Sequence, residues 1–527
     1  MTGNALLSKE IKKRRTFAII SHPDAGKTTL TERLLLIGGA IRLAGSIKGR
    51  KTKTYAASDW MEMEQQRGIS ITSSVLQFNY QGYKINLLDT PGHQDFSEDT
   101  YRTLTAADCA LMMIDMAKGV ESQTIKLFEV CRLQGIPIFT FINKLDRQGK
   151  EPLDLLDELE KVLGIGSFPM NWPAGAAPGQ YGIYHRKARQ LELYRSGEEL
   201  SVIEADDAGV EHPQIRQALD EYSYNKLKDE VSLLEAAGDT FDREKVDQGL
   251  LTPVFFGSAI SGFGVAPFFE QFLSMSPPPA PRDSSIGLIK PETEEFSAVT
   301  FKIQANMNPA HRDRIAFFRI CSGTFKRDMP VNHVRTGKQI KLAQPQQFLA
   351  QNRNITEEAF PGDIIGLYDP GIFKIGDTLT EGKPFHFKKL PRFSPENFAR
   401  VTTRAAIKHK QFHKGLNQLA EEGAVQVFTS LGADNIILGA VGELQFEVFK
   451  HRLQSEYGVD VQMERLSYRF LRWVKGLEAK ELPPLLNALS VKDREGNLYF
   501  LFESEFWYKT ALEKIADENL RPIEEMA

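Results

Sequence analysis

The amino-acid sequence predicts an α/β domain with a mostly parallel sheet, followed by a small β-barrel domain and an α+β domain. In the first part, apolar strand-sized runs alternate with amphipathic helical stretches, which is typical of a parallel sheet covered by helices on both faces. Short β-like runs separated by glycine turns follow and indicate a barrel; strands and helices then mix. We expect the domains at residues 1–280, 281–390 and 391–527, with an insertion into the first at about 165–250.

The size and composition of the chain agree with several soluble domains in a reducing compartment. Its 527 residues correspond to three or four domains at roughly 150 residues each. Three cysteines, Cys109, Cys131 and Cys321, are too few and too scattered for a disulfide framework or a metal cluster. No apolar run is as long as a membrane span, and the N-terminus lacks the apolar segment of a secretory signal. We therefore expect a cytoplasmic protein without a membrane partner.

The charge balance does not indicate a nucleic-acid binder, because the formal net charge is −4. Contacts with RNA would have to come from local basic patches, at 9–15, 47–53 and 404–414. On charge alone, each patch is more typical of a solvated surface.

The elements of the α/β domain follow in a regular order. A buried-strand run at 16–21 precedes a helical stretch that ends in glycines at 27–39. Two apolar runs flank Gln81-Gly82, a pair typical of a hairpin turn. After them we expect strands at 110–115, 136–143 and 252–259 and helices at 121–135 and 151–164.

Proline, glycine and aromatic residues, then an acidic helical stretch, form the insertion at about 165–250. A proline-rich linker at 274–285 ends the domain, because proline runs cannot continue a helix. The β-like runs of the barrel are 296–305, 314–323, 362–371 and 373–382. In the last part, 413–428 predicts a helix and a strand, and 435–464 predicts a strand, a helix and a strand.

The stretch Ser21–Thr29, "SHPDAGKTT", predicts a phosphate-binding loop. A strand leads into a tight turn, Gly26 leaves room for a phosphate, Lys27 can reach the β- and γ-phosphates, and Thr28 can offer a hydroxyl to Mg²⁺. A helix begins at once and adds the positive end of its dipole. Ser21 replaces the glycine that usually opens the pattern, but a small residue still allows the turn. We expect nucleotide contacts from Ser21, His22, Pro23, Asp24, Ala25, Gly26, Lys27 and Thr28.

A second loop, "DTPGH", follows an apolar run. Asp89 at the strand end can hold Mg²⁺ through water, and the Gly92 N–H can reach a γ-phosphate. Neighbouring parallel strands would place this loop beside the first one. His93 is then the candidate catalytic residue, orienting the attacking water. We expect this loop, Asp89, Thr90, Pro91, Gly92 and His93, to contact the nucleotide.

A third loop, "NKLD", predicts the base. The Asp146 carboxylate can accept from the N1–H and the exocyclic amine of guanine, a donor pair that adenine lacks. Such a site can reject the wrong base by roughly 10⁴–10⁵, because a buried carboxylate would be left unpaired. Asn143 can tie the loops together and the Lys144 stem can cover the base. We therefore expect GTP or GDP, bound by Asn143, Lys144, Leu145 and Asp146.

Two weaker signals complete the site. The tripeptide Gly257–Ala259 follows the last strand, and a backbone N–H of Ser258 or Ala259 can meet the guanine O6. Between the first two loops, Ser70 can supply a second hydroxyl to Mg²⁺ and close a switch over the γ-phosphate. Thr72 and Ser73 are rivals for that role. The predicted metal ligands are thus Thr28, Ser70 and Asp89.

With these loops in this order, the chain resembles the translational GTPases. The resemblance covers nearly the whole chain, since the β-rich middle resembles the barrel of that family and the last part resembles the ferredoxin-like α+β domain of the elongation factor G subgroup. It implies a P-loop GTPase domain followed by these two. There are two departures: Ser70 stands where much of the family has threonine, which keeps the hydroxyl, and residues after about 475 match only loosely.

Long runs such as "FKIQANMNPAHRDRIAF" are most similar to the members of this family that act in termination. The resemblance implies a ribosome-stimulated GTPase that ejects class-I peptide release factors after the peptide is freed, with the ribosome placing His93. Its partners would be the ribosome and those factors, its cofactors GTP or GDP and Mg²⁺, and it would be a monomer off the ribosome.

Three other functions stay open. Another ribosomal GTPase, such as a translocase, would carry two more domains after the third. A metabolic GTPase subunit shares the GTPase-plus-barrel plan but lacks the α+β domain. A GTP-dependent binding module would show no turnover with or without ribosomes.

Overall fold

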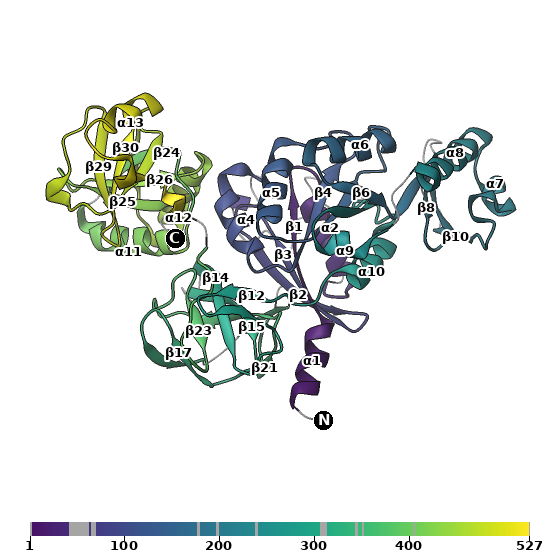
Figure 1. Cartoon of the computed structure of the whole chain (residues 1–527), viewed down its shortest axis with the longest axis horizontal. Coiled ribbons are helices and arrows are strands. Elements are labelled where there is room, and N and C mark those ends of the chain that lie inside the picture. The colour runs from purple at the N-terminus through teal and green to yellow at the C-terminus, as the bar shows by residue number, and fades with distance from the viewer. Residues whose placement is uncertain are drawn as a thin grey trace.

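A computed structural model describes residues 3–41, 63–64, 70–175, 180–195, 200–237, 241–305, 314–342, 346–349, 352–390, 392–403 and 406–525. The basic patch at 47–53 and the start of the one at 404–414 lie outside these residues. In Figure 1 the α/β domain is central, the insertion projects on one side, and the barrel and the C-terminal domain lie on the other. The helix α1 (Gly3–Lys13) extends from the sheet beside the barrel.

The first domain is built on a seven-stranded sheet in the order β2-β3-β1-β4-β5-β11-β6. Its neighbours pair in parallel except β2 and β3, which form the expected hairpin. The strands are β1 (Arg14–Ser21), β2 (Ser74–Tyr80), β3 (Tyr83–Asp89), β4 (Cys109–Asp115), β5 (Ile138–Asn143), β6 (Gly166–Pro169) and β11 (Leu251–Phe256). The helices are α2 (Lys27–Ile37), α4 (Ser97–Leu104), α5 (Ser122–Leu133), α6 (Pro152–Leu163), α9 (Arg243–Asp247) and α10 (Val265–Met275).

Two apolar cores lie on opposite faces of this sheet, as strand alternation requires. Phe17 and Ile19 of β1 belong to the core that contains residues of α2 and α10, whereas Ala18 and Ile20 belong to the core that contains residues of α5 and α6. Because β1, β3, β4, β5 and β11 pair in parallel, they end at one common edge of the sheet, and the loops that follow them meet there.

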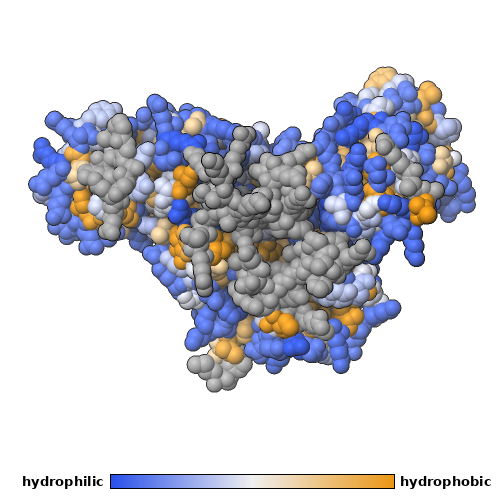
Figure 2. All heavy atoms as spheres, turned by 180° about the vertical axis from the view of Figure 1, so that it is seen from behind, coloured by the Kyte–Doolittle hydropathy of each residue, from blue (hydrophilic) through white to orange (hydrophobic). Residues whose placement is uncertain are grey.

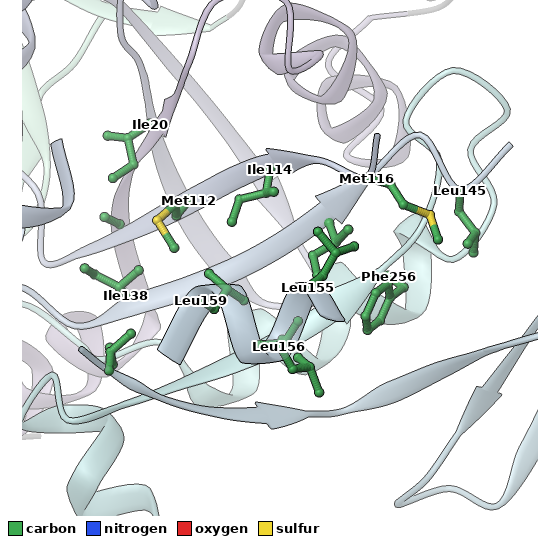
Figure 3. Packing of buried hydrophobic residues seen from close by; sticks show 14 of the residues in the cluster. Ile20, Met112, Ile114, Met116, Ile138, Leu145, Leu155, Leu156, Leu159 and Phe256 are labelled. Carbon is green, nitrogen blue, oxygen red and sulfur yellow. The ribbon is translucent and has the colours of Figure 1, made fainter. Parts of the chain in front are cut away.

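The helix α6 shows how sequence pattern becomes packing. Pro152 starts it and Gly164, with a φ of 67°, ends it. In Figure 3, Leu155 and Leu159 lie on the side of the helix that faces Ile114 and Ile138, and Leu156 lies on the opposite side. Leu155 and Leu159 are each 1% exposed and contribute about 1.5–3 kcal/mol apiece, so they hold the helix against the core.

The insertion forms a separate four-stranded sheet in the order β10-β9-β8-β7, followed by the helices α7 and α8. The chain leaves the main sheet after β6 and returns to it with β11. The elements are β7 (Asn171–Ala174), β8 (Gln180–His185), β9 (Gln190–Arg195), β10 (Ser201–Glu204), α7 (Pro213–Ala218) and α8 (Glu221–Ala237).

The middle domain is β-rich, as expected from its glycine-separated runs. Its main sheet has the order β18-β17-β23-β14-β15-β22-β19-β20, with short pairs β12-β13 and β16-β21 beside it. The strands are β12 (Arg282–Ser284), β13 (Gly287–Ile289), β14 (Ser297–Ala305), β15 (Arg314–Ser322), β16 (Phe325–Lys326), β17 (Pro330–His333), β18 (Lys338–Lys341), β19 (Gln346–Leu349), β20 (Asn352–Ile355), β21 (Glu358–Ala359), β22 (Ile364–Tyr368) and β23 (Thr378–Thr380).

The C-terminal domain begins as a βαββαβ unit with the strand order β27-β24-β26-β25, which is the ferredoxin-like arrangement. Its elements are β24 (Asn397–Thr403), α11 (His409–Glu421), β25 (Gln426–Ser430), β26 (Ile436–Ala440), α12 (Leu444–Tyr457) and β27 (Val461–Leu466). The sequence did not predict that the remaining strands extend the same sheet beyond β25. These elements are β28 (Phe470–Val474), β29 (Ala488–Asp493), β30 (Leu498–Phe502), β31 (Leu520–Arg521) and the helix α13 (Glu505–Ala511).

The surface and the cysteines agree with the composition. Hydrophilic residues dominate the described surface in Figure 2, and apolar residues form small separate groups, as is ordinary for a protein surface. The three cysteines are buried and free, and burial raises the pKa of Cys131 to about 12. Across the described ranges, none of the helices has the length and apolar character needed to cross a membrane.

Candidate functional site

A pocket of about 270 Å³ lies at the edge where the parallel strands of the first domain end. Segments far apart in the sequence meet in it: the loop after β1, the start of α2, and the loops after β3, β5 and β11. Its lining residues are Ser21, His22, Pro23, Asp24, Gly26, Lys27, Thr28, Thr29, Ser70, Gly92, His93, Asn143, Lys144, Asp146, Arg147 and Ile260.

The remaining predicted residues do not line this pocket, but several of them bond the loops that form it. Asp89 and Thr90 are buried and bonded to Lys27 and to the Ile19 carbonyl, respectively. The Leu145 N–H donates to the Gly257 carbonyl at 3.1 Å, which joins the third and fourth loops. These supporting residues are Ala25, Asp89, Thr90, Pro91, Leu145, Ser258 and Ala259.

The first loop needs glycine at its last position. Gly26 precedes α2 with a φ of 99°, in the left-handed region that favours glycine. A Cβ there would fall 2.3 Å from Asn143 Nδ2, so no side chain fits. Among the described residues no side chain caps α2, so its first N–H groups can serve an anion in the pocket.

Lys27 and Asp89 form a buried ion pair at this edge, with Nζ and Oδ1 2.5 Å apart. Lys27 is 6% exposed and Asp89 2%. Within the described part of the chain, the second oxygen of Asp89, Oδ2, is buried without a hydrogen-bond partner. A buried carboxylate oxygen without a donor is suited to a cation or its bound water.

The contacts of the three candidate hydroxyls before β2 differ. Ser70 lines the pocket. The Thr72 N–H donates to Glu64 Oε1 at 3.1 Å, and the Ser73 hydroxyl donates to Asp99 Oδ2 at 2.6 Å. Of the three residues, Ser70 is the one that lines the pocket.

His93 lies at the mouth of the pocket, with its side chain 36% exposed. Its Nδ1 atom accepts from the Asp95 N–H at 3.3 Å. A neutral ring in this arrangement carries its proton on Nε2, which can donate to a water.

The same loop contacts the C-terminal domain. Asp95 Oδ2 accepts from the Leu444 N–H at the start of α12, at 2.7 Å. A Cβ on Gly442 would fall 2.3 Å from Asp95 Oδ1, so the Asp95 carboxylate packs directly against the Gly442 backbone. The orientation of His93 is thus linked by one residue to the position of the last domain.

Asn143 and Lys144 tie the third loop to the first. The Asn143 amide donates to the Ala25 carbonyl at 2.8 Å and accepts from the Ala259 N–H at 2.9 Å. Lys144 Nζ donates to the Asp24 carbonyl at 2.6 Å and to Asp115 Oδ2 at 2.7 Å. Burial alone would raise the pKa of Asp115, but the hydrogen bond from Lys144 lowers it below its ordinary value.

Asp146 is held at both its side chain and its backbone. Its Oδ1 atom accepts from the Ser258 hydroxyl at 2.5 Å, and its carbonyl accepts from the Tyr181 hydroxyl at 2.8 Å. Its side chain is 21% exposed, and Oδ2 is 3.8 Å from Arg147 Nε. Asp146 lines the pocket, and its Oδ2 atom has only this longer contact among the described residues.

Several residues at this site were not expected from the sequence. Asp115 ends β4 as Asp89 ends β3, so its position at a strand end was an available signal. Arg147 and Ile260 line the pocket next to predicted loop residues. Tyr181 comes from the insertion, and no sequence motif marks it as a site residue, because only folding brings it to Asp146.

Family models match successive parts of the chain. Residues 12–278 match the elongation factor Tu GTP binding domain, 295–382 match elongation factor G domain 2, and 387–512 match the class II release factor RF3 C-terminal domain.

Curated relatives and a solved structure extend this comparison. Peptide chain release factor 3 of Symbiobacterium thermophilum is 56% identical over 513 residues, which is 96% of this chain and 97% of that protein. The protein of the same name from Listeria innocua is 54% identical over 501 residues, 95% of this chain and 96% of that one. A crystal structure of a protein from Thermus thermophilus has a TM-score of 0.69 at 23% identity, covering 93% of this chain and 72% of that one, and so supports the fold alone.

Proposed function

The chain belongs to the peptide chain release factor 3 family of translational GTPases and hydrolyses GTP, and we propose that it does so on the ribosome, where it promotes dissociation of class-I peptide release factors. The observation that carries this proposal is similarity over nearly the full chain to relatives of that name, including the family-specific match at 387–512. The expected family, fold and enzyme class are thereby confirmed. Binding to the ribosome and to class-I factors, a monomeric state off the ribosome and a cytoplasmic location are part of the proposal.

The phosphates would bind at the loop after β1. The open N-terminus of α2 offers backbone donors, and Lys27 would turn from Asp89 toward the β- and γ-phosphates. The residues fit Mg²⁺: Asp89 Oδ2 is buried and without a partner in the described ranges, and Thr28 and Ser70 line the neighbouring pocket. Bound Mg²⁺ would neutralise charge on the β- and γ-phosphate oxygens.

His93 would orient the attacking water through Nε2. With Nδ1 occupied by the Asp95 N–H, the neutral ring donates and does not abstract a proton. A positioned water alone leaves several kcal/mol of transition-state stabilisation missing, so the free protein would be slow. We infer that the ribosome completes the site by fixing His93, which couples hydrolysis to the correct complex.

A ribosome assay tests this function against the alternatives. Ribosomes that hold a labelled class-I release factor after peptide release are mixed with the protein and GTP, and phosphate release and factor dissociation are followed together. We expect both to be faster than without the protein. Stimulated tRNA movement without factor dissociation would indicate a translocase, and turnover indifferent to ribosomes would indicate a metabolic GTPase subunit.

Substitution of Asp146 by asparagine is expected to change which base is bound. The amide can accept only one of the two guanine donors and can donate to the C2 carbonyl of xanthine, so the preference for GTP over xanthosine triphosphate falls by roughly 100-fold or more. Competition against labelled GDP measures this ratio. The control Asp154→Asn, which removes an exposed carboxylate on α6, keeps the wild-type ratio. An unchanged ratio in Asp146→Asn would contradict the assigned role.

A further inference from the structure

The insertion reaches the nucleotide site through one tyrosine. Tyr181, the second residue of β8, donates its hydroxyl to the Asp146 carbonyl at 2.8 Å. The Asp146 carboxylate in turn accepts from the Ser258 hydroxyl at 2.5 Å. The base-reading residue is therefore held from its backbone by the insertion and from its side chain by the loop after β11.

The same β8–β9 hairpin also packs against the loop after β11, which contains Ser258. The Tyr194 ring in β9 stacks on Tyr181 with centroids 6.4 Å apart and lies 5.8 Å from the Phe263 ring. The Phe263 carbonyl accepts from the Ser258 N–H at 3.0 Å. Two tyrosines of one β-hairpin thus contact the Asp146 loop and the Ser258 loop together.

The hairpin and the loop before α10 approach so closely that only glycine fits between them. Gly264 precedes α10 with a φ of 71°, and a Cβ there would fall 2.5 Å from Ile183 Cδ1 of β8. Ile183 and the Tyr184 ring belong to the core shared with α5 and α6 of the first domain. The hairpin is therefore packed into the first domain, and Tyr181 is held where its hydroxyl meets Asp146.

We propose that Tyr181 is a positioning residue for guanine recognition. In this proposal the insertion acts on nucleotide binding by holding the Asp146 and Ser258 loops in fixed positions relative to each other. A carboxylate that reads two donors on a flat base discriminates only while its orientation is fixed. Without the Tyr181 bond, the Asp146 peptide gains freedom, and the base is released sooner and read less strictly. This inference rests on the proposed reading of guanine by Asp146 and extends it to a residue outside the nucleotide loops.

The chain offers a matched control. Tyr181→Phe removes the hydroxyl that bonds Asp146 and keeps the ring stack. Tyr194→Phe removes a hydroxyl from the adjoining ring, for which the described residues provide no hydrogen bond. Both substitutions keep the same apolar volume, so their difference isolates the bond to Asp146.

The experiment uses the full-length protein and a fluorescent GDP. We expect Tyr181→Phe to speed dissociation of the GDP about fivefold, the effect of one neutral hydrogen bond. It should also lower the preference for GTP over xanthosine triphosphate and raise KM for GTP on ribosomes with kcat unchanged. Tyr194→Phe should match the wild type in all three.

Two results would overturn the inference: unchanged GDP dissociation in Tyr181→Phe, or equal changes in both variants, which would indicate general loosening of the insertion. Melting temperatures of both variants identify the second case. GDP dissociation needs no ribosome, so a failure of the ribosomal function would appear as lost ribosome stimulation in the wild type and leave this test readable.

Discussion

Lys27→Ala is expected to abolish measurable binding of GTP and GDP, with a loss of affinity of roughly 100-fold or more. The ammonium group is buried and lies 2.5 Å from Asp89 Oδ1. Its removal takes away the cation that meets the phosphates and leaves a buried carboxylate beside them, which repels the nucleotide. Calorimetric titration with GDP and Mg²⁺ measures the loss.

The substitution also affects the fold, so binding and stability have to be separated. Removing one partner of a buried pair costs about 3–5 kcal/mol, because the other charge stays buried without compensation. The double variant Lys27→Met with Asp89→Asn removes both charges. We expect it to recover much of the melting temperature that Lys27→Ala loses and still to bind no nucleotide. Binding restored in the double variant would show that Lys27 acts only through stability.

The nucleotide loops could be predicted because their chemistry is local. Gly26, Lys27 and Thr28 are consecutive, and the strand before them and the helix after them are both readable from apolar spacing. Loops that follow parallel strands meet at one edge, so Asp89 and Asn143 could be placed near them without coordinates.

Features that depend on tertiary contact could not be predicted in this way. The choice among Ser70, Thr72 and Ser73 rests on which of them lines the pocket, and Asp99, which bonds Ser73, lies 26 residues from it in the sequence. Tyr181 lies 35 residues from Asp146 and has no motif around it. The strands β28 to β30 are as long as β25 to β27, but they join the same sheet through the pairing of β29 with β25, which no local pattern marks, and β31 has only two residues.

Asp95 links the third domain to His93, the candidate catalytic residue. Asp95 donates its N–H to His93 Nδ1, and its carboxylate accepts from the N-terminus of α12. A shift of α12 would therefore act on the backbone that orients the histidine. The domain that carries the family-specific match is in this way in direct contact with the candidate catalytic loop.

His93→Ala is expected to leave GTP and GDP binding intact and to lower ribosome-stimulated hydrolysis by at least about tenfold, since the attacking water loses the hydrogen bond that orients it in the transition state. Binding is retained because the imidazole is 36% exposed and, among the described residues, shares no hydrogen bond or ion pair with Lys27 or Asp89. Single-turnover phosphate release on ribosomes, at saturating protein, measures the chemical step apart from binding. His93→Gln, which keeps a side-chain donor, should retain more activity than alanine.

A matched histidine separates this local effect from a general one. His386→Ala removes an exposed histidine of the middle domain whose side chain has no hydrogen bond to the described residues, so it should hydrolyse GTP as the wild type does. If His93→Ala also kept the wild-type rate, the histidine would have no catalytic role, and water orientation would fall to another group at the pocket. If its rate fell together with its GDP affinity, the residue would belong to the binding site. Only lost turnover with intact affinity supports water orientation, because that pattern requires an interaction made in the transition state and not with the bound nucleotide.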